Sequence, residues 1–191
     1  MTGFFMRCCK KLSLLLVLSC AATLAFAVSS SVLIKSAEMH LADDYYELFA
    51  EIDMSFDESV VEAINKGVPL EFVTEFQVVS PRTYWFDDEI ETISSRATLN
   101  YHALSRQYLV SRAGTQKSFE TLSEAKEELT SINAWRVVDK NKIEKGEDYK
   151  ASLLMRLDQD KLPKVLQVEV IGSKDWLLTS PTFSWPFKEQ K

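Results

Sequence analysis

Two histidines, His40 and His102, are the only imidazoles in the chain, and they are the first residues to test for metal chemistry. A zinc site needs three or four nitrogen, sulfur or carboxylate ligands, which often occur in short spacings such as HExxH. The two histidines are far apart in the sequence, and neither belongs to such a spacing. All three cysteines, Cys8, Cys9 and Cys20, lie near the N-terminus. The sequence therefore predicts no metal site.

Acidic runs are the next candidates, because carboxylates bind calcium. The two runs of interest are Asp87-Asp88-Glu89 and Asp158-Gln159-Asp160. An EF-hand loop needs a glycine at its sixth position and a glutamate at its twelfth, and neither run has that layout. We expect Asp158 and Asp160 to flank a turn at the end of a strand instead.

Catalytic nucleophiles and phosphate-binding loops also lack their usual motifs. The chain has no GxSxG turn and only five glycines, whereas phosphate-binding loops are rich in glycine. Paired carboxylates of a glycoside hydrolase can come together only in the fold, so an uncharacterised hydrolase stays open as an alternative. The sequence predicts a protein that is not an enzyme, without catalytic residues and without a cofactor.

Arginine and aromatic residues gather in two nearby segments, PRTYWFDDE and NYHALSRQY. Tyrosine, tryptophan and arginine are enriched at binding hot spots, but they are also ordinary strand residues that pack across a sheet. In one interpretation, residues 82–86 form a short aromatic strand in a packed ladder, followed by an acidic turn. In the other, the set is an exposed partner surface. The candidate residues are Arg82, Tyr84, Trp85, Tyr101, Arg106 and Tyr108.

The N-terminal segment has the three-part layout of a secretory signal peptide. Arg7, Lys10 and Lys11 are basic, Leu12–Leu24 is apolar, and Ala25-Phe26-Ala27 fits a cleavage site. Two alternatives stay open. Residues 12–28 could remain as an inner-membrane anchor, although their length of about 25 Å is short for a hydrocarbon core of about 30 Å. Cys20 could be a lipoprotein cysteine.

Removal of residues 1–27 would leave one domain, residues 28–191. The whole chain carries 22 basic and 28 acidic residues and a net charge of −6. The removed segment holds three bases and no acid, so 19 basic and 28 acidic residues would stay, with a net charge of −9. An acidic domain of this kind is not expected to bind nucleic acid or anionic membrane surfaces.

Strict alternation of apolar and polar residues predicts three antiparallel strands with one packed face. These strands are residues 45–54, 71–79 and 149–158. Residues 165–170 alternate in the same way. The run 96–112 changes phase near Ala103, which predicts one long strand bent by a β-bulge.

Capping patterns predict two short helices between the strands. One begins at the box Ser55-x-x-Glu58 and ends at Gly67, and the other begins at Thr121-x-x-Glu124. Together the elements predict a mainly β fold, a single antiparallel β-sandwich with two short peripheral helices, preceded by the apolar signal helix.

Six segments in order resemble the DUF4390 family of exported bacterial proteins. They are INKGVPLEF, SPRTYWFDDE, LNYHALSRQYLV, SFETLSEAKEEL, RLDQDKLPKVLQVEV and DWLLTS, and they span about residues 32–182. The tail departs from the family pattern with Pro181 and Pro186. The resemblance implies an N-terminal signal peptide, no established activity and a link with an envelope sensor system.

We therefore expect an exported envelope protein, periplasmic or held by residues 12–28, that binds another envelope protein without catalysing a reaction. An alternative is a β-sandwich that binds a small apolar ligand or lipid between its sheets, lined by some of its phenylalanines and tryptophans.

The leader gives a direct prediction. N-terminal sequencing of the exported protein should begin at Val28, because cleavage is expected after Ala27. A sequence that still begins at Met1 would show a retained anchor, and one that begins at a modified Cys20 would show lipoprotein processing.

Overall fold

The structure is a computed structural model that describes residues 31–82, 84–170 and 172–188. The predicted signal peptide, residues 1–27, lies outside the described residues. In chain order the elements are β1 (Ser31–Ala42), β2 (Tyr45–Ser55), α2 (Glu58–Asn65), β3 (Leu70–Ser80), β4 (Asp88–His102), β5 (Gln107–Arg112), β6 (Thr115–Phe119), α3 (Leu122–Thr130), β7 (Ser131–Asp139), β8 (Tyr149–Leu157), α4 (Lys164–Val170) and β9 (Phe183–Phe187).

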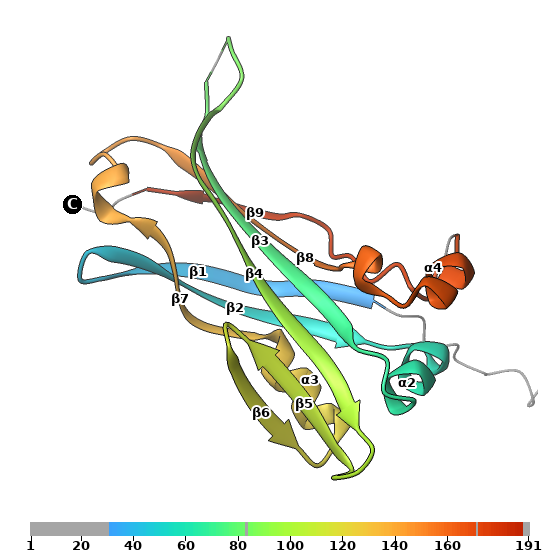
Figure 1. Ribbon diagram of the computed structural model, residues 1–191. Helices are drawn as coiled ribbons and strands as arrows, with labels where there is room; N and C mark the ends of the chain where they lie inside the picture. The colour runs from blue at the N-terminus through green and yellow to red at the C-terminus, as the bar shows by residue number, and fades with distance from the viewer. Residues whose placement is uncertain (1–30, 83, 171, 189–191) are drawn as a thin grey trace, which may run out of the picture.

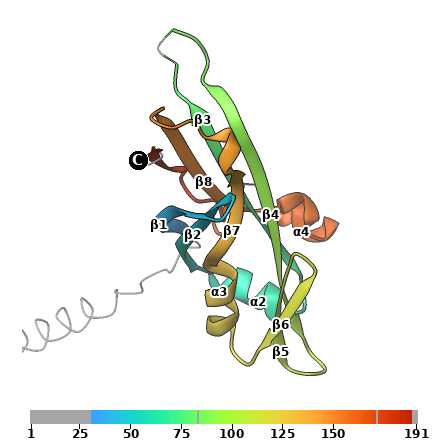
Figure 2. The same ribbon diagram turned by 90° about the vertical axis from the view of Figure 1, so that its left-hand side faces the viewer.

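The strands form two antiparallel sheets (Figure 1). One sheet has the order β1-β2-β7 and the other has the order β6-β5-β4-β3-β8-β9. Buried residues from both sheets belong to one hydrophobic cluster. Figure 2 shows β1, β2 and β7 on one side of β4 and α4 on the other. The prediction of a mainly β, antiparallel fold is confirmed, and α4 is a third helix that was not predicted.

The alternation in the sequence matches the burial in the structure. In β2, β3 and β8 the residues predicted to face the core are buried, because a strand points successive side chains to opposite faces. These residues are Tyr46, Leu48, Ala50, Ile52, Met54, Phe72, Thr74, Phe76, Val78, Tyr149, Ala151, Leu153, Met155 and Leu157.

The predicted bent strand over residues 96–112 is wrong, because β4 ends at His102 and the chain reverses into β5. The turn contains Arg106 with φ +54°. The two phases in the sequence belong to two strands that pair with each other, with Leu99 opposite Val110. The apolar side chains of both strands, such as Leu99 and Val110, therefore point into the core. The change of phase in the sequence marks the turn between the two strands.

The predicted strand over residues 165–170 is also wrong, because this segment is α4. Pro163 precedes the helix, and its carbonyl accepts hydrogen bonds from the backbone N–H groups of Leu166 and Gln167 at 2.9 and 3.1 Å. A proline at a helix start is favoured because its φ is already helical. Leu166 and Val170, four residues apart and so on one helical face, pack in the core, whereas Val165 is 75% exposed, so the apolar residues here belong to a helical face and not to a strand face.

Helix capping was predicted correctly for one helix and misplaced for the other. The Thr121 and Glu124 capping box of α3 is present. For α2 the cap is Asp57, which accepts a hydrogen bond from the Ser59 N–H at 2.9 Å. That bond holds the pKa of Asp57 below its ordinary value. Ser55 instead ends β2, and Gly67 follows α2 with φ +84°, as predicted.

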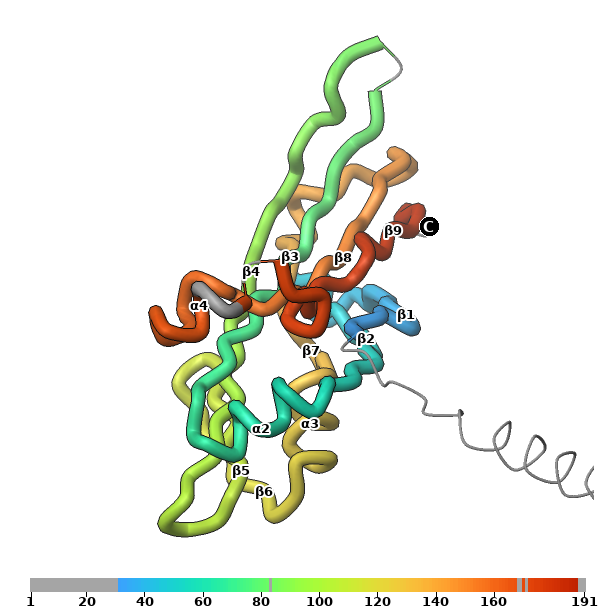
Figure 3. The backbone as a smooth tube through the Cα atoms, turned by 90° about the vertical axis from the view of Figure 1, so that its right-hand side faces the viewer, coloured from blue at the N-terminus to red at the C-terminus, as the bar shows by residue number. Residues whose placement is uncertain are grey.

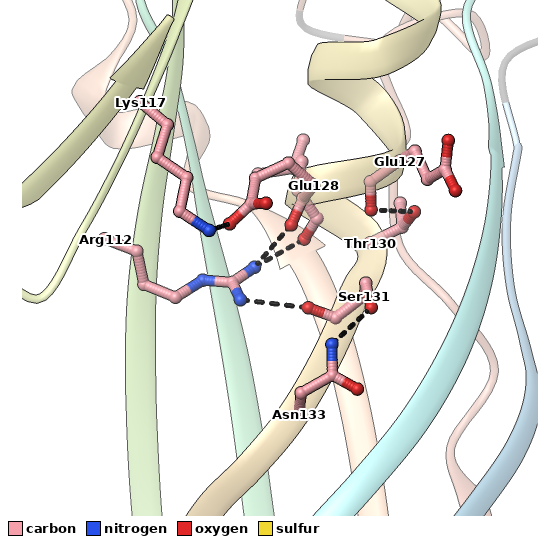
Figure 4. A network of polar contacts seen from close by, with 8 residues as sticks. Arg112, Lys117, Glu127, Glu128, Thr130, Ser131 and Asn133 are labelled. Carbon is pink, nitrogen blue, oxygen red and sulfur yellow. Dashed lines mark hydrogen bonds and ion pairs between the residues drawn. The ribbon is translucent and has the colours of Figure 1, made fainter.

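The passage from α3 into β7 is held by one arginine of β5 (Figure 4). Arg112 donates to the carbonyls of Leu129 and Ser131 at 2.7 and 3.0 Å, and Lys117 pairs with Glu128 at 2.7 Å. Burial lowers the pKa of Arg112, but a guanidinium stays charged. Carbonyls at a helix end have no partner within the helix, so Arg112 satisfies them and ties the six-stranded sheet to the chain that enters the other sheet.

Phe76 links three strands at the centre of the core. It is fully buried, and its ring lies 6.5 Å from that of Trp135 in β7 and 6.3 Å from that of Trp185 in β9. We predict that Phe76→Ala lowers the free energy of unfolding by about 3–5 kcal/mol. Leu104→Ala is the control, because Leu104 is 93% exposed, and it should change stability by less than about 0.5 kcal/mol. Urea denaturation of both variants followed by circular dichroism checks this, and equal midpoints would contradict the described core.

Candidate functional site

Three consecutive aromatic side chains lie in water at the tip of the β3–β4 hairpin. Tyr84, Trp85 and Phe86 are 95%, 75% and 87% exposed. The tip extends past the ends of the neighbouring strands (Figures 1 and 3). Single exposed apolar residues are common on proteins, but contiguous apolar patches usually mark a contact surface. We call Tyr84, Trp85 and Phe86 the aromatic tip.

Polar contacts close the base of the aromatic tip. The guanidinium of Arg82 pairs with the carboxylate of Asp88 across the turn, and the Arg82 N–H donates to Asp87 Oδ1 at 3.2 Å. The rings of Trp85 and Phe86 meet edge to face, with centroids 6.5 Å apart and an interplanar angle of 81°. Arg82, Asp87 and Asp88 therefore connect the two sides of the hairpin below its tip. The three aromatic side chains form the outer surface of the tip.

The predicted aromatic strand at residues 82–86 is wrong. β3 ends at Ser80 and β4 begins at Asp88, so Arg82, Tyr84, Trp85 and Phe86 lie in the connection between the two strands and not in a strand. Pro81 explains the break in physical terms, because it has no backbone N–H to donate to a ladder.

The other half of the predicted set lies at the opposite end of β4. Tyr101 and Tyr108 are cross-strand partners with ring centroids 4.9 Å apart. The hydroxyl of Tyr108 donates to Asn65 Oδ1 of α2 at 2.7 Å. Burial raises the pKa of Tyr108. Both tyrosines are half-buried and form the packed ladder of the first interpretation, and Arg106 is exposed in the adjoining turn.

The six candidate residues therefore do not form one surface. β4 has 15 residues, which at about 3.3 Å per residue separates its ends by about 45 Å. Arg82, Tyr84 and Trp85 lie at one end, and Tyr101, Arg106 and Tyr108 lie at the other. Phe86 was missing from the set, although it is as exposed as its neighbours. Three adjacent aromatic residues between a proline and an acidic run were the signal that could have included it.

A shallow pocket of about 300 Å³ opens where β7 approaches β4. The guanidinium of Arg136 lies 5.6 Å from the centre of the Tyr45 ring. Lys142 pairs with Glu91, and that pairing raises the pKa of Lys142. The charged groups around this pocket are thus already paired within the chain, which leaves little for a ligand to satisfy. The lining residues are Tyr45, Glu91, Ile93, Arg136, Val137, Val138, Asp139 and Lys142.

Aromatic side chains pack together around Phe76, where the two sheets meet. Phe76 packs against Trp135 and Trp185, and Phe183 lies 5.7 Å from Trp185 between ring centroids. Packed rings of this kind form a dry protein interior. The phenylalanine and tryptophan side chains around Phe76 therefore pack against the hydrophobic core.

Residues with possible catalytic or metal roles are dispersed. Among residues 31–82, 84–170 and 172–188, no group of three or more His, Cys, Asp or Glu side chains is placed to hold a metal ion. Asp158 begins a short 3₁₀ turn over Gln159–Lys161 at the end of β8, as predicted. An SxxK spacing that sequence reasoning missed, Ser123 and Lys126, lies on α3, and no hydrogen bond between these two side chains is found.

None of the helices in the described part of the chain combines the length and the apolar character needed to cross a membrane.

The architecture and the aromatic tip define a two-sheet, mainly β protein with an exposed aromatic hairpin tip. The chain matches the family model described as "Domain of unknown function (DUF4390)" over residues 29–186, and it belongs to that family. The match confirms the resemblance drawn from the six sequence segments. No curated protein and no solved structure matches the chain.

The aromatic tip should be dispensable for folding. We predict that replacing Tyr84, Trp85 and Phe86 together by serine changes the free energy of unfolding by less than about 0.5 kcal/mol, because these side chains have little packing to lose. Tyr101→Ala should destabilise by about 2 kcal/mol, because Tyr101 packs against Tyr108. Chemical denaturation measures both, and a triple variant less stable than Tyr101→Ala would show that the tip is part of the core.

Proposed function

We propose that this protein is an exported, non-enzymatic binding module of the cell envelope, and that its aromatic tip is the contact with a partner protein. The observation that carries the proposal is the exposure of Tyr84, Trp85 and Phe86 at the end of a framed hairpin. Tryptophan and tyrosine supply large contact areas at low entropic cost, which is why they are frequent at binding hot spots.

The frame around the turn supports a role in binding. Arg82 and Asp88 are paired across the base, and Asp87 accepts the Arg82 N–H at 3.2 Å. A loop that is ordered before it meets its partner loses less conformational entropy on binding. The two sheets serve in this proposal as a β-sandwich scaffold that holds the hairpin rigid behind the tip.

The proposed location and partner are based on the sequence. The basic, apolar and small-residue layout of residues 1–27 supports export, so the partner is sought in the cell envelope. The motifs shared with DUF4390 suggest a sensor protein as one such partner. Binding of a small ligand or lipid between the sheets is not favoured, because Phe76, Trp135 and Trp185 occupy that space.

Affinity capture with matched variants tests the proposal. The tagged full chain is recovered from envelope extracts after gentle crosslinking, in three forms: wild type, the triple serine variant of the aromatic tip, and Leu104→Ser. Leu104 is a fair control because it is 93% exposed in the turn at the other end of β4. We expect the same partner with wild type and Leu104→Ser, and at least about 30-fold less with the tip variant, the loss expected for hot-spot residues.

Two results would contradict the proposal. One is that no protein is recovered reproducibly with the wild-type chain. The other is that the same partner is recovered equally well with the triple serine variant, because the contact would then lie elsewhere on the molecule.

A further inference from the structure

Acidic residues surround the aromatic tip and indicate the chemistry of its partner. We infer that the partner presents an apolar cleft whose rim carries arginine or lysine side chains. This inference rests on the proposed function, because it concerns the same tip. It adds the charge of the partner, which aromatic exposure alone does not give.

The charge excess at the tip is local. Asp87, Asp88 and Glu89 follow the aromatic residues, and Arg82 is the single base within residues 82–89. One positive charge against three negative charges leaves an excess of two negative charges. We call Asp87, Asp88 and Glu89 the acidic collar.

Neighbouring bases do not cancel the collar. Lys142 is paired with Glu91 and Lys188 with Asp148. Val79 of β3 pairs with Glu89 of β4 on one side and with Lys150 of β8 on the other. Lys150 and Glu89 are therefore separated by two strand spacings. Charges farther back along the strands are screened beyond about 8–10 Å in physiological salt. A partner that covers the tip therefore meets the unbalanced collar.

Glu89 is the collar residue that a partner can reach most freely. Asp87 and Asp88 already bind Arg82, whereas Glu89 is exposed and makes only a long hydrogen bond, 3.4 Å, from Gln77 Nε2. An uncompensated carboxylate at the edge of an apolar contact is stabilised by a cation on the partner. Arginine suits this place best, because one guanidinium can bind a carboxylate and stack on the face of Trp85.

The same collar argues against a lipid surface as the occupant. Segments that insert into a membrane interface pair their aromatic residues with Lys or Arg, which attract anionic lipids. Here the flanking residues are mostly acids, and the whole chain carries a net charge of −6. Aromatic residues within an acidic collar fit a protein cleft with a basic rim.

Site-specific photocrosslinking tests the inference on the full exported chain in intact cells. A photoreactive phenylalanine analogue replaces Phe86, and the crosslinked products are identified by mass spectrometry. The crosslink is then measured in the Glu89→Lys and Glu89→Gln backgrounds and, as the control, in Glu127→Lys. Glu127 is exposed on α3, at the other end of the molecule from the tip, so the control makes the same charge change away from the collar.

We expect a crosslink to protein. Its yield should fall about threefold to tenfold with Glu89→Lys, which is the effect expected for the loss of one or two exposed charge pairs. The yield should fall less with Glu89→Gln and should not change with Glu127→Lys. The crosslinked partner segment should lie beside Arg or Lys residues. Higher salt in isolated envelopes should lower the yield for the wild-type chain.

Other outcomes would separate the two proposals. A protein crosslink that is equally strong with Glu89→Lys and Glu127→Lys would overturn the basic rim and leave the proposed function standing. Crosslinks to lipid alone would overturn both. A blue shift of tryptophan fluorescence on vesicles of phosphatidylethanolamine and phosphatidylglycerol that disappears with Trp85→Phe, combined with no protein crosslink, would also overturn both proposals.

Discussion

The antiparallel pairing of β3 with β4 is the constraint on which the rest of the structure depends. Every residue of β3, from Leu70 opposite Leu99 to Ser80 opposite Asp88, has a partner in β4, and the register shifts once, between Val78 and Val79. At one end the pair is anchored in the core by residues such as Phe72 and Leu99, both fully buried. At the other end it carries the aromatic tip beyond the strands that flank it (Figure 1). Among the residues that the structure describes, one strand pair thus connects the most buried and the most exposed aromatic side chains.

This arrangement separates two uses of the same residue types. Phe76 is fully buried, and Trp135 and Trp185 are half-buried against it, so each of these side chains contributes roughly 25 cal/mol per Å² removed from water. The aromatic tip is exposed in the free protein, so its side chains do not contribute this burial energy to folding. The same apolar area is then available when a partner covers it. The proposed partner contact would bury this area.

Sequence periodicity predicted strands with a long, strict alternation and missed strands that are short, such as β6 and β9, or that shift register, such as β1 and β7. β2, β3 and β8 have a strict period of two and were predicted with the correct faces. β1 was not predicted, because a bulge between Ile34 and Ser36 shifts its apolar phase. β7 was not predicted, because α3 runs into it without a loop and β7 shifts register twice against β2.

The candidate site was predicted only in part, for a different physical reason. The residue types at Arg82, Tyr84 and Trp85 drew attention to the correct segment. Their exposure depends on whether any other part of the chain covers the turn, and no local pattern encodes that. The pairing of Tyr101 with Tyr108 depends on the turn at residues 103–106, which was interpreted as a bulge. Local composition therefore indicated the correct segment, but only the tertiary arrangement separates the exposed residues of the set from the packed ones.

The central claim is that the aromatic tip is open in the isolated protein and covered in the cell envelope. Hydroxyl-radical footprinting of the tip peptide in both settings tests it most directly, with the exposed turn at Leu104 as an internal reference. The account predicts strong oxidation of Tyr84, Trp85 and Phe86 in the purified protein and clear protection in intact cells, with the reference unchanged. Equal oxidation of the tip in both settings, or a tip already protected in the purified protein, would contradict it.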